Sequence, residues 1–169
     1  MTQIQELDRQ EEDGNVKLFY QTIIYKSTLN KIKKIFNKHG KFLDDSPGKL
    51  TRGGFQTPNI INLFNDEILK EIIPFNDFYK KCFWIHYIKY RKGGFQLRHD
   101  HKETENYSFI LYLNDSDGNT YFEDPINLSI APKEGRLVVF DASIIHSAEK
   151  SFNNKEILVG AIDKVKCHI

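Results

Sequence analysis

Short apolar runs separated by turn residues fill the second half of the chain. Strands are predicted at residues 82–90, 95–101, 107–113, 119–123, 126–130, 136–140 and 156–162. Glycine, proline, asparagine and aspartate stand between these runs, and such residues favour turns and end strands. Regular short strands joined by turns are typical of an all-β barrel or jelly roll. The pattern therefore predicts a mainly β fold for this half.

The first half of the chain carries apolar residues at helical spacing instead. A strand predicted over residues 16–25 is followed by an amphipathic helix over about 28–39 and a second one over about 60–72. Residues 41–58 are rich in glycine and proline and are predicted to form a loop. Two helices ahead of the strands would cover one face of the sheet. The expected architecture is a helix-flanked β-sandwich or barrel.

Length and composition fit one folded domain. The chain has 169 residues, of which 40% are hydrophobic and 28% are charged. A chain of this length can bury roughly two-thirds of its unfolded surface, so a sizeable core is possible. This composition excludes disordered, collagen-like and disulfide-rich proteins. We expect a single domain over residues 1–169, with residues 1–14 as a loose, charged arm.

Charge and the length of the apolar runs argue against nucleic-acid and membrane partners. The sequence has 24 Lys and Arg residues against 23 Asp and Glu residues, a net charge of +1, so no global field attracts nucleic acid. No apolar run approaches the roughly 20 residues that span a bilayer. The first residues are polar and acidic, unlike a signal peptide, and the widely spaced Cys82 and Cys167 fit reduced thiols. A cytoplasmic localisation is expected.

Three histidines stand out as candidate metal ligands. His99 and His101 flank one residue in a predicted strand, and residues two apart in a strand point to the same face. His146 follows the predicted strand at residues 136–140. Three converging imidazoles inside a barrel mouth would suit Fe(II), Zn or Cu.

The ordered motifs of the second half resemble a known enzyme family. Residues 90–101, 107–115, 118–125 and 132–148 are similar, in that order, to segments of the 2-oxoglutarate- and Fe(II)-dependent oxygenases, near their prolyl-hydroxylase-like branch. The resemblance covers residues 84–163, about half of the chain. It implies a double-stranded β-helix, or jelly roll, with N-terminal helices. It also implies a dioxygenase that uses Fe(II), 2-oxoglutarate and O₂, most simply a hydroxylase.

The resemblance assigns roles to individual residues. His99 matches the first metal ligand of the family and His146 the distal one. Lys155 lies nine residues after His146, near the family's basic residue for the far carboxylate of 2-oxoglutarate. Tyr112 matches a tyrosine that hydrogen-bonds the same carboxylate, and Tyr90 matches a tyrosine that lines the cosubstrate pocket.

The third metal ligand departs from the family pattern. The usual motif is His-x-Asp or His-x-Glu, whereas this chain has His101 in the third position. One interpretation keeps His99, His101 and His146 as a three-histidine site. A second shifts the motif to His101 and Glu103, which restores a carboxylate. A third is a degraded metal site.

Alternatives to an oxygenase therefore stay open. A cupin-like enzyme would use a three-histidine metal without 2-oxoglutarate, and an inactive jelly roll would only bind a partner. The substrate of an oxygenase would be a peptidyl side chain, an amino acid or another small metabolite. Two further expectations concern single segments. The loop at 41–58, with its glycines Gly48, Gly53 and Gly54, is a candidate mobile flap, and His86 is interpreted as a core or surface histidine.

Overall fold

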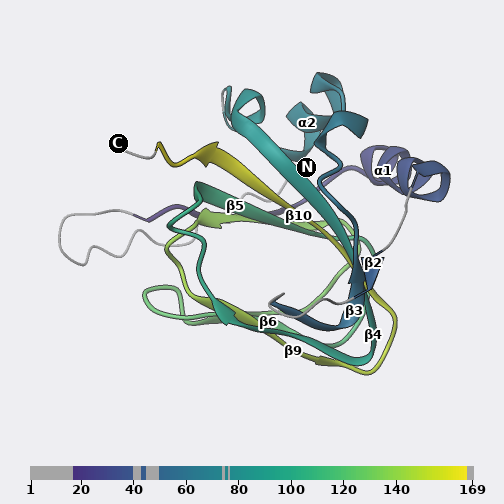
Figure 1. Cartoon of the computed structure of the whole chain (residues 1–169), viewed down its shortest axis with the longest axis vertical. Helices are drawn as coiled ribbons and strands as arrows, with labels where there is room; N and C mark the ends of the chain where they lie inside the picture. The colour runs from purple at the N-terminus through teal and green to yellow at the C-terminus, as the bar shows by residue number, and fades with distance from the viewer. Residues whose placement is uncertain (1–16, 40–42, 45–49, 74, 76, 167–169) are drawn as a thin grey trace.

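Antiparallel strands build one curled sheet with helices on one side. A computed structural model of the chain describes residues 17–39, 43–44, 50–73, 75 and 77–166. The arm expected at 1–14 lies outside these residues, as do Gly48 and Cys167. Within the described part, ten strands form a single sheet that curls until β5 and β10 face β6 and β9 across the interior (Figure 1). This architecture confirms the predicted mainly β jelly roll with N-terminal helices.

The order of strands along the sheet does not follow the order along the chain. From one edge it runs β1 (Phe19–Ile23), β8 (Arg136–Asp141), β5 (Glu105–Tyr112), β10 (Lys155–Lys164), β4 (Cys82–His99), β9 (His146–Ser151), β6 (Thr120–Phe122) and β7 (Leu128–Ile130). A further strand, β3 (Thr51–Gln56), pairs with β4 and with the short β2 (Leu43–Asp44). Non-local pairings therefore hold the barrel together.

β4 joins the two halves of the barrel. Its first part pairs with β10, and its last part, from Gly94 to His99, pairs with β9. The sequence predicted that Gly93 and Gly94 would end a strand, but the strand continues through them with shifts of register. A strand with such irregularities bends and twists more strongly. This bend carries β4 from one side of the barrel to the other.

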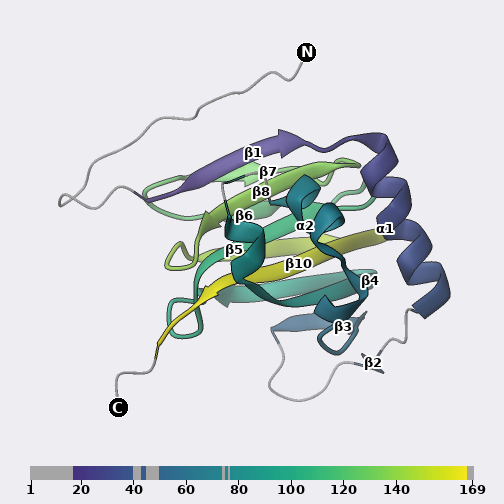
Figure 2. The same cartoon turned by 90° about the horizontal axis from the view of Figure 1, so that it is seen from above.

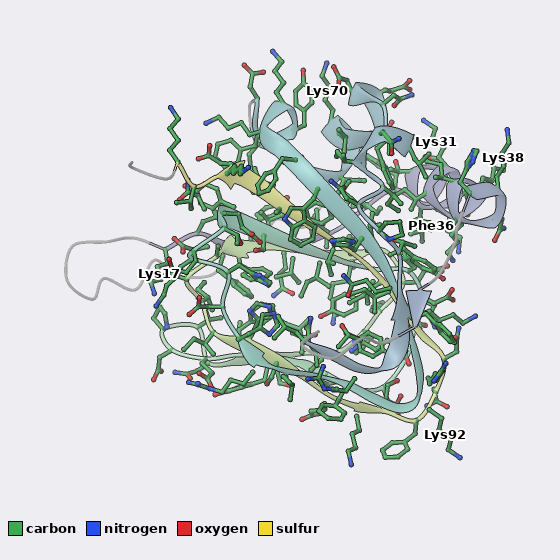
Figure 3. All side chains as sticks on the ribbon, viewed as in Figure 1. Lys17, Lys31, Phe36, Lys38, Lys70 and Lys92 are labelled. Carbon is green, nitrogen blue, oxygen red and sulfur yellow. The ribbon has the colours of Figure 1, made fainter. Side chains whose placement is uncertain are left out.

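The strand β5 separates two cores. On β5, Phe109 and Leu111 belong to the core under the helices, whereas Ile110 and Tyr112 belong to a second core inside the barrel. This alternation is the two-residue period of a strand. Side chains fill the interior of the curled sheet, as Figure 3 shows. The candidate site residues belong to the inner face.

The helices cover the outer core. The helix α1 (Lys26–His39) lies where the sequence predicted it, and its Phe36 ring stacks on Tyr87 of β4 with the ring centroids 4.2 Å apart. Its Lys31 and Lys38 lie on the outside of the molecule (Figure 3). Both helices sit on the same side of the sheet (Figure 2). None of the helices in the described residues is long and apolar enough to cross a membrane.

The second helix starts later than predicted. Residues 61–63 form a 3-10 turn, η1 (Ile61–Leu63), and the α-helix α2 (Asp66–Ile72) begins after Asn65. The Asn65 side chain accepts a hydrogen bond from the Ile68 N–H at 3.0 Å, as an N-cap residue does. A second 3-10 turn, η2 (Phe78–Lys81), then leads into β4. The apolar spacing alone did not reveal the cap.

The segment predicted as a loop at 41–58 contains β3. Gly53 has a φ of +66°, and a Cβ on Gly94 would lie 2.3 Å from the Gly53 carbonyl oxygen. Glycine at both positions lets β3 and β4 approach closely. The loop prediction is therefore wrong for Gly53 and Gly54, because both lie within a paired strand.

We expect Gly160→Ala to destabilise the fold. A Cβ at Gly160 of β10 would lie 2.2 Å from the Cε1 atom of Phe109, which is buried under the helices. Overpacking of this kind costs about 1–3 kcal/mol in the free energy of unfolding. Urea denaturation of the two proteins measures the loss. Lys89→Ala on β4 is the control, since Lys89 is exposed; an equal loss in both variants would contradict the steric explanation.

Candidate metal centre

Three histidines lie close together where β4 ends and β9 begins. His99 is the last residue of β4 and pairs directly with His146, the first residue of β9. His101 follows two residues later, and its Nε2 lies 3.0 Å from the Nε2 of His99. The ligand atoms of all three lie within 4.8 Å of one another. Two nitrogens bound at about 2.1 Å to one ion at a right angle are about 3 Å apart. The spacing therefore fits a shared metal ion.

Hydrogen bonds orient two of the imidazoles. The Nδ1–H of His99 donates to the Leu97 carbonyl at 2.6 Å, and that of His146 donates to the Ile144 carbonyl at 3.0 Å. This arrangement leaves each Nε2 with its lone pair for a metal. The Nδ1 of His101 lies 3.7 Å from a carboxylate oxygen of the buried Glu105. Each Nδ1 thus faces an oxygen atom.

Burial keeps the imidazoles neutral. Loss of solvent, together with the neighbouring His99 and His101, lowers the pKa of His146 to about 3. The same loss of solvent lowers the pKa of His101 to about 4 and also lowers that of His99. The His146 ring packs against the rings of Phe122 and Phe140. Neutral imidazole is the form that binds metal, so the site is ready for an ion near neutral pH.

The structure does not place Glu103 beside the three histidines, as the shifted His101-x-Glu103 motif requires. Glu103 is exposed in the turn after β4 and does not belong to the histidine group. Asp100, between the two histidines, instead accepts a hydrogen bond from the Lys102 N–H. Within the described part of the chain, no carboxylate therefore joins this group of ligands. The departure from the family's His-x-Asp pattern persists in three dimensions.

The three residues expected around the cosubstrate lie on the inner face of the barrel. Lys155 pairs directly with Tyr90 across β10 and β4, and its Nζ lies 4.7 Å from the centre of the Tyr90 ring. The Lys155 Nζ donates to the Gly118 carbonyl at 2.6 Å. The Tyr112 hydroxyl donates to the Thr120 Oγ1 at 2.7 Å. All three expected side chains are buried.

Lys155 is a buried cation without a paired anion. Its exposed fraction is 1%, and no carboxylate of the described residues lies within ion-pair distance of its Nζ. Burial lowers the pKa of Lys155 to about 8, although Asp117 and Glu149 act in the opposite direction. Buried charges are normally paired. An anionic ligand would supply the missing partner.

The sequence predicted a turn at Asp117–Gly118, but it did not show that this turn contacts Lys155. Asp117 accepts hydrogen bonds from the Ser151 hydroxyl at 2.8 Å and from the Phe152 and Asn153 N–H groups at 3.0 Å each. Gly118 has a φ of +78°, and a Cβ there would lie 2.9 Å from the Glu149 carbonyl oxygen. The Asp117–Gly118 turn therefore clamps the connection between β9 and β10. The clamp depends on contacts with residues more than thirty positions away.

A cavity of about 210 Å³ adjoins the metal centre. His101 and His146 line it, together with Trp84, His86 and side chains from β3, β5 and β10. Lys155 is not among the lining residues. His86, interpreted from the sequence as a core or surface histidine, donates from its Nδ1 to the Thr57 carbonyl at 2.8 Å and faces this cavity. The sequence carried no signal for the cavity, because its walls come from six separate strands.

Comparisons with known proteins agree with this geometry. No protein-family model matches the sequence, and no curated protein matches it. A prolyl-4-hydroxylase from Pseudomonas putida superposes with a TM-score of 0.65 at 15% identity, covering 88% of this chain and 93% of the other. A prolyl hydroxylase from Trichoplax adhaerens, in complex with a peptide fragment of the hypoxia inducible factor oxygen degradation domain, gives 0.65 at 14% identity, covering 87% and 83%.

A third matching structure is described with a ligand of a different kind. HygX from Streptomyces hygroscopicus, with nickel, 2-oxoglutarate and hygromycin B bound, superposes with a TM-score of 0.63 at 8% identity, covering 86% of this chain and 82% of the other. The chain has the fold of the 2-oxoglutarate- and iron-dependent oxygenases. This confirms the resemblance drawn from the sequence motifs at the level of the fold. It also places the histidine group within an oxygenase fold.

We expect His101, not Glu103, to be the third ligand in this oxygenase fold. His101→Ala should weaken Zn(II) binding by more than the roughly 10–100-fold that loss of an outer-shell partner costs. Glu103→Ala is the matched control and should leave the affinity unchanged, because Glu103 is exposed. Competition with a chelating dye measures both. Weaker binding in Glu103→Ala with unchanged binding in His101→Ala would restore the shifted motif.

We also expect the ionisation of Asp117 to make the stability of the fold depend on pH. Hydrogen bonds from the Asn153 and Phe152 N–H groups hold the pKa of Asp117 at about 2, below its ordinary value of 3.8. The folded state therefore gains stability above pH 3.8 that it loses as the pH falls towards 2.

In the test, Asp117→Asn should unfold at lower temperature than the wild type at pH 6. This difference should shrink as the pH falls through that window. Thermal unfolding followed by circular dichroism gives both values. The exposed Asp77, substituted by asparagine, is the control. A difference that stays constant with pH would show that the charge of Asp117 is not what matters.

Proposed function

We propose that the chain is a single-domain 2-oxoglutarate-dependent dioxygenase. It hydroxylates a peptidyl side chain, an amino acid or a small metabolite. In this reaction one atom of O₂ enters a C–H bond of the substrate as a hydroxyl group. The other enters succinate as 2-oxoglutarate loses CO₂. Bound Fe(II) and 2-oxoglutarate supply this oxidising chemistry. The residues of the chain bind and orient these groups and the substrate, and they shield them from water.

The observation that carries the proposal is the histidine group inside an oxygenase fold. Three neutral imidazoles offer nitrogen atoms within 4.8 Å of one another, and imidazole suits iron as well as zinc and copper. The group occupies the end of β4 and the start of β9, so rigid strands hold two of its members. Three protein ligands leave open positions on an ion for a cosubstrate and O₂.

Lys155 is the residue proposed to bind the far carboxylate of 2-oxoglutarate. Its buried ammonium group has no ion-pair partner among the described carboxylates, which supports this role. The Tyr112 hydroxyl is proposed to donate to the same carboxylate, and the Tyr90 ring to form a wall of the pocket. The Gly118 carbonyl holds the Lys155 side chain in the interior. The Asp117–Gly118 turn is thus a positioning element for the cosubstrate.

The known proteins of this fold support a substrate range rather than one substrate. One of the superposed hydroxylases is described with a peptide fragment, and HygX is described with hygromycin B and 2-oxoglutarate. A jelly roll of this kind therefore accommodates either a peptide or a small molecule. The proposal keeps both classes.

A second candidate is a cupin-like metal enzyme that does not use 2-oxoglutarate. The lack of a carboxylate among the described metal ligands favours it, because three neutral ligands leave the full charge of the ion uncompensated. Under this alternative, Lys155 would have no role in binding a cosubstrate. The two functions therefore differ in what Lys155 does.

Anaerobic titration separates the candidates. Fe(II)-loaded protein should develop a weak visible charge-transfer band when 2-oxoglutarate is added, because the ketone and near carboxylate chelate ferrous iron. His146→Ala should abolish the band. Lys155→Met should keep iron binding but raise the Kd for 2-oxoglutarate at least about tenfold, since a hydrogen bond from a charged group is worth about 1.5–3 kcal/mol.

Lys133→Met is the matched control, because Lys133 is exposed. It should leave the Kd for 2-oxoglutarate unchanged. Iron binding without a band would reject 2-oxoglutarate as cosubstrate and favour the cupin-like enzyme. Absence of iron binding would leave a jelly-roll binding module.

A further inference from the structure

The cavity beside the metal centre lies apart from the residues assigned to 2-oxoglutarate. Its walls include Trp84 and His86 of β4, Ser108 of β5 and Val159 of β10. Lys155 lies four residues before Val159 on the same strand, which corresponds to about 13 Å along it. At its other end the cavity reaches Ile88, two positions before Tyr90 on β4, and Lys155 does not line it. The cavity and the buried ammonium group are therefore neighbouring but separate parts of the barrel interior. The histidine group borders the cavity through His101 and His146.

No charged side chain lines this cavity. Its lining residues include no Asp, Glu, Lys or Arg, and their ionisable side chains are histidines. Transfer of a charged group from water into such surroundings costs several kcal/mol unless a partner of opposite charge is present. When no uncompensated metal ion borders it, the cavity thus selects against both anionic and cationic groups.

The cavity nevertheless offers neutral hydrogen-bonding groups. Gln56 of β3 and Gln96 of β4 line it with side-chain amides, and Trp84 lines it with its indole ring. None of these three side chains forms a hydrogen bond with another residue of the described part of the chain. All three are partly buried. A site whose polar groups have no hydrogen-bond partner within the protein favours a ligand that carries both donors and acceptors.

We propose that this cavity binds the substrate through an uncharged carboxamide-type group. A carboxamide both donates and accepts, as do the side chains of Gln56 and Gln96, and its planar shape suits a contact with the Trp84 ring. The volume of about 210 Å³ admits a group of amino-acid size rather than a large ligand. The inference rests on the proposed function, since it takes the cavity to be the substrate side of the metal centre.

The sequence provides a direct probe of the cavity. Trp84 is the single tryptophan of the chain, so tryptophan fluorescence reports on this site alone. Zn(II)- and 2-oxoglutarate-loaded protein is titrated with butyramide, butyrate and butylammonium, which differ only in their polar end. Butyramide should bind at least about tenfold more tightly than the other two, because an unpaired buried polar or charged group costs about 1–3 kcal/mol or more. The titration is repeated on metal-free protein, where butyrate has no ion to bind.

Variants test which residues give the preference. Gln96→Leu should weaken butyramide binding about tenfold and leave butyrate and butylammonium as weak as before. Gln21→Leu on β1, away from the cavity, is the matched control and should change nothing. Butyrate binding as tight as butyramide in metal-free protein would overturn the proposal. So would the absence of any fluorescence change with butyramide.

The charge-transfer titration on Fe(II)-loaded protein from the same purification keeps the two proposals apart. A band with 2-oxoglutarate but no butyramide binding would reject the neutral substrate cavity and leave the proposed function in place. Butyramide binding at Trp84 without a band would retain the neutral cavity and reject the 2-oxoglutarate chemistry.

Discussion

The antiparallel register of β4 with its two partners sets the geometry of the whole candidate site. Near one end of the strand His99 pairs with His146 of β9, and nine residues earlier Tyr90 pairs with Lys155 of β10. A slip of one residue in either ladder would turn these side chains to the opposite face of the sheet. The close contact of Gly53 and Gly94 allows the bend between the two pairings. The candidate metal ligands and the residues proposed to bind the cosubstrate thus depend on one strand.

A neutral ligand set changes the electrostatics of the centre. Two histidines and a carboxylate would offset part of the charge of a divalent ion, whereas three buried imidazoles offset none of it. The missing negative charge must then come from a bound anion, and 2-oxoglutarate carries two. Its far carboxylate would also pair with the buried ammonium group of Lys155. Ion and anion are therefore expected to stabilise each other's binding, because each removes an uncompensated charge in a site of low dielectric.

Part of this arrangement could be read from local patterns. The two-residue spacing of His99 and His101 predicted that both could reach one ion, and their ligand atoms do converge, although β4 ends at His99 and His101 lies beyond it. The alternation of apolar residues located most strands. β9 escaped prediction because its sequence is polar, and its pairing with β4 and β6 supplies the hydrogen bonds that hold it. β3 escaped because its glycines favour turns in isolation. Propensity describes a residue and its neighbours, whereas these strands are determined by partners distant in the sequence.

The interior of the barrel divides into a charged level and a neutral level, with the histidine group bordering the neutral one. At the charged level, Lys155 provides a cation without an anion. At the neutral level, Gln56 and Gln96 provide amides without partners in the described residues. Burial of an anion is favourable beside Lys155 and costs free energy in the neutral cavity. An uncharged amide has the opposite preference. The two proposed ligands would therefore not compete for the same part of the barrel. The sorting follows from the charge of each level, so it requires no movement of the sheet.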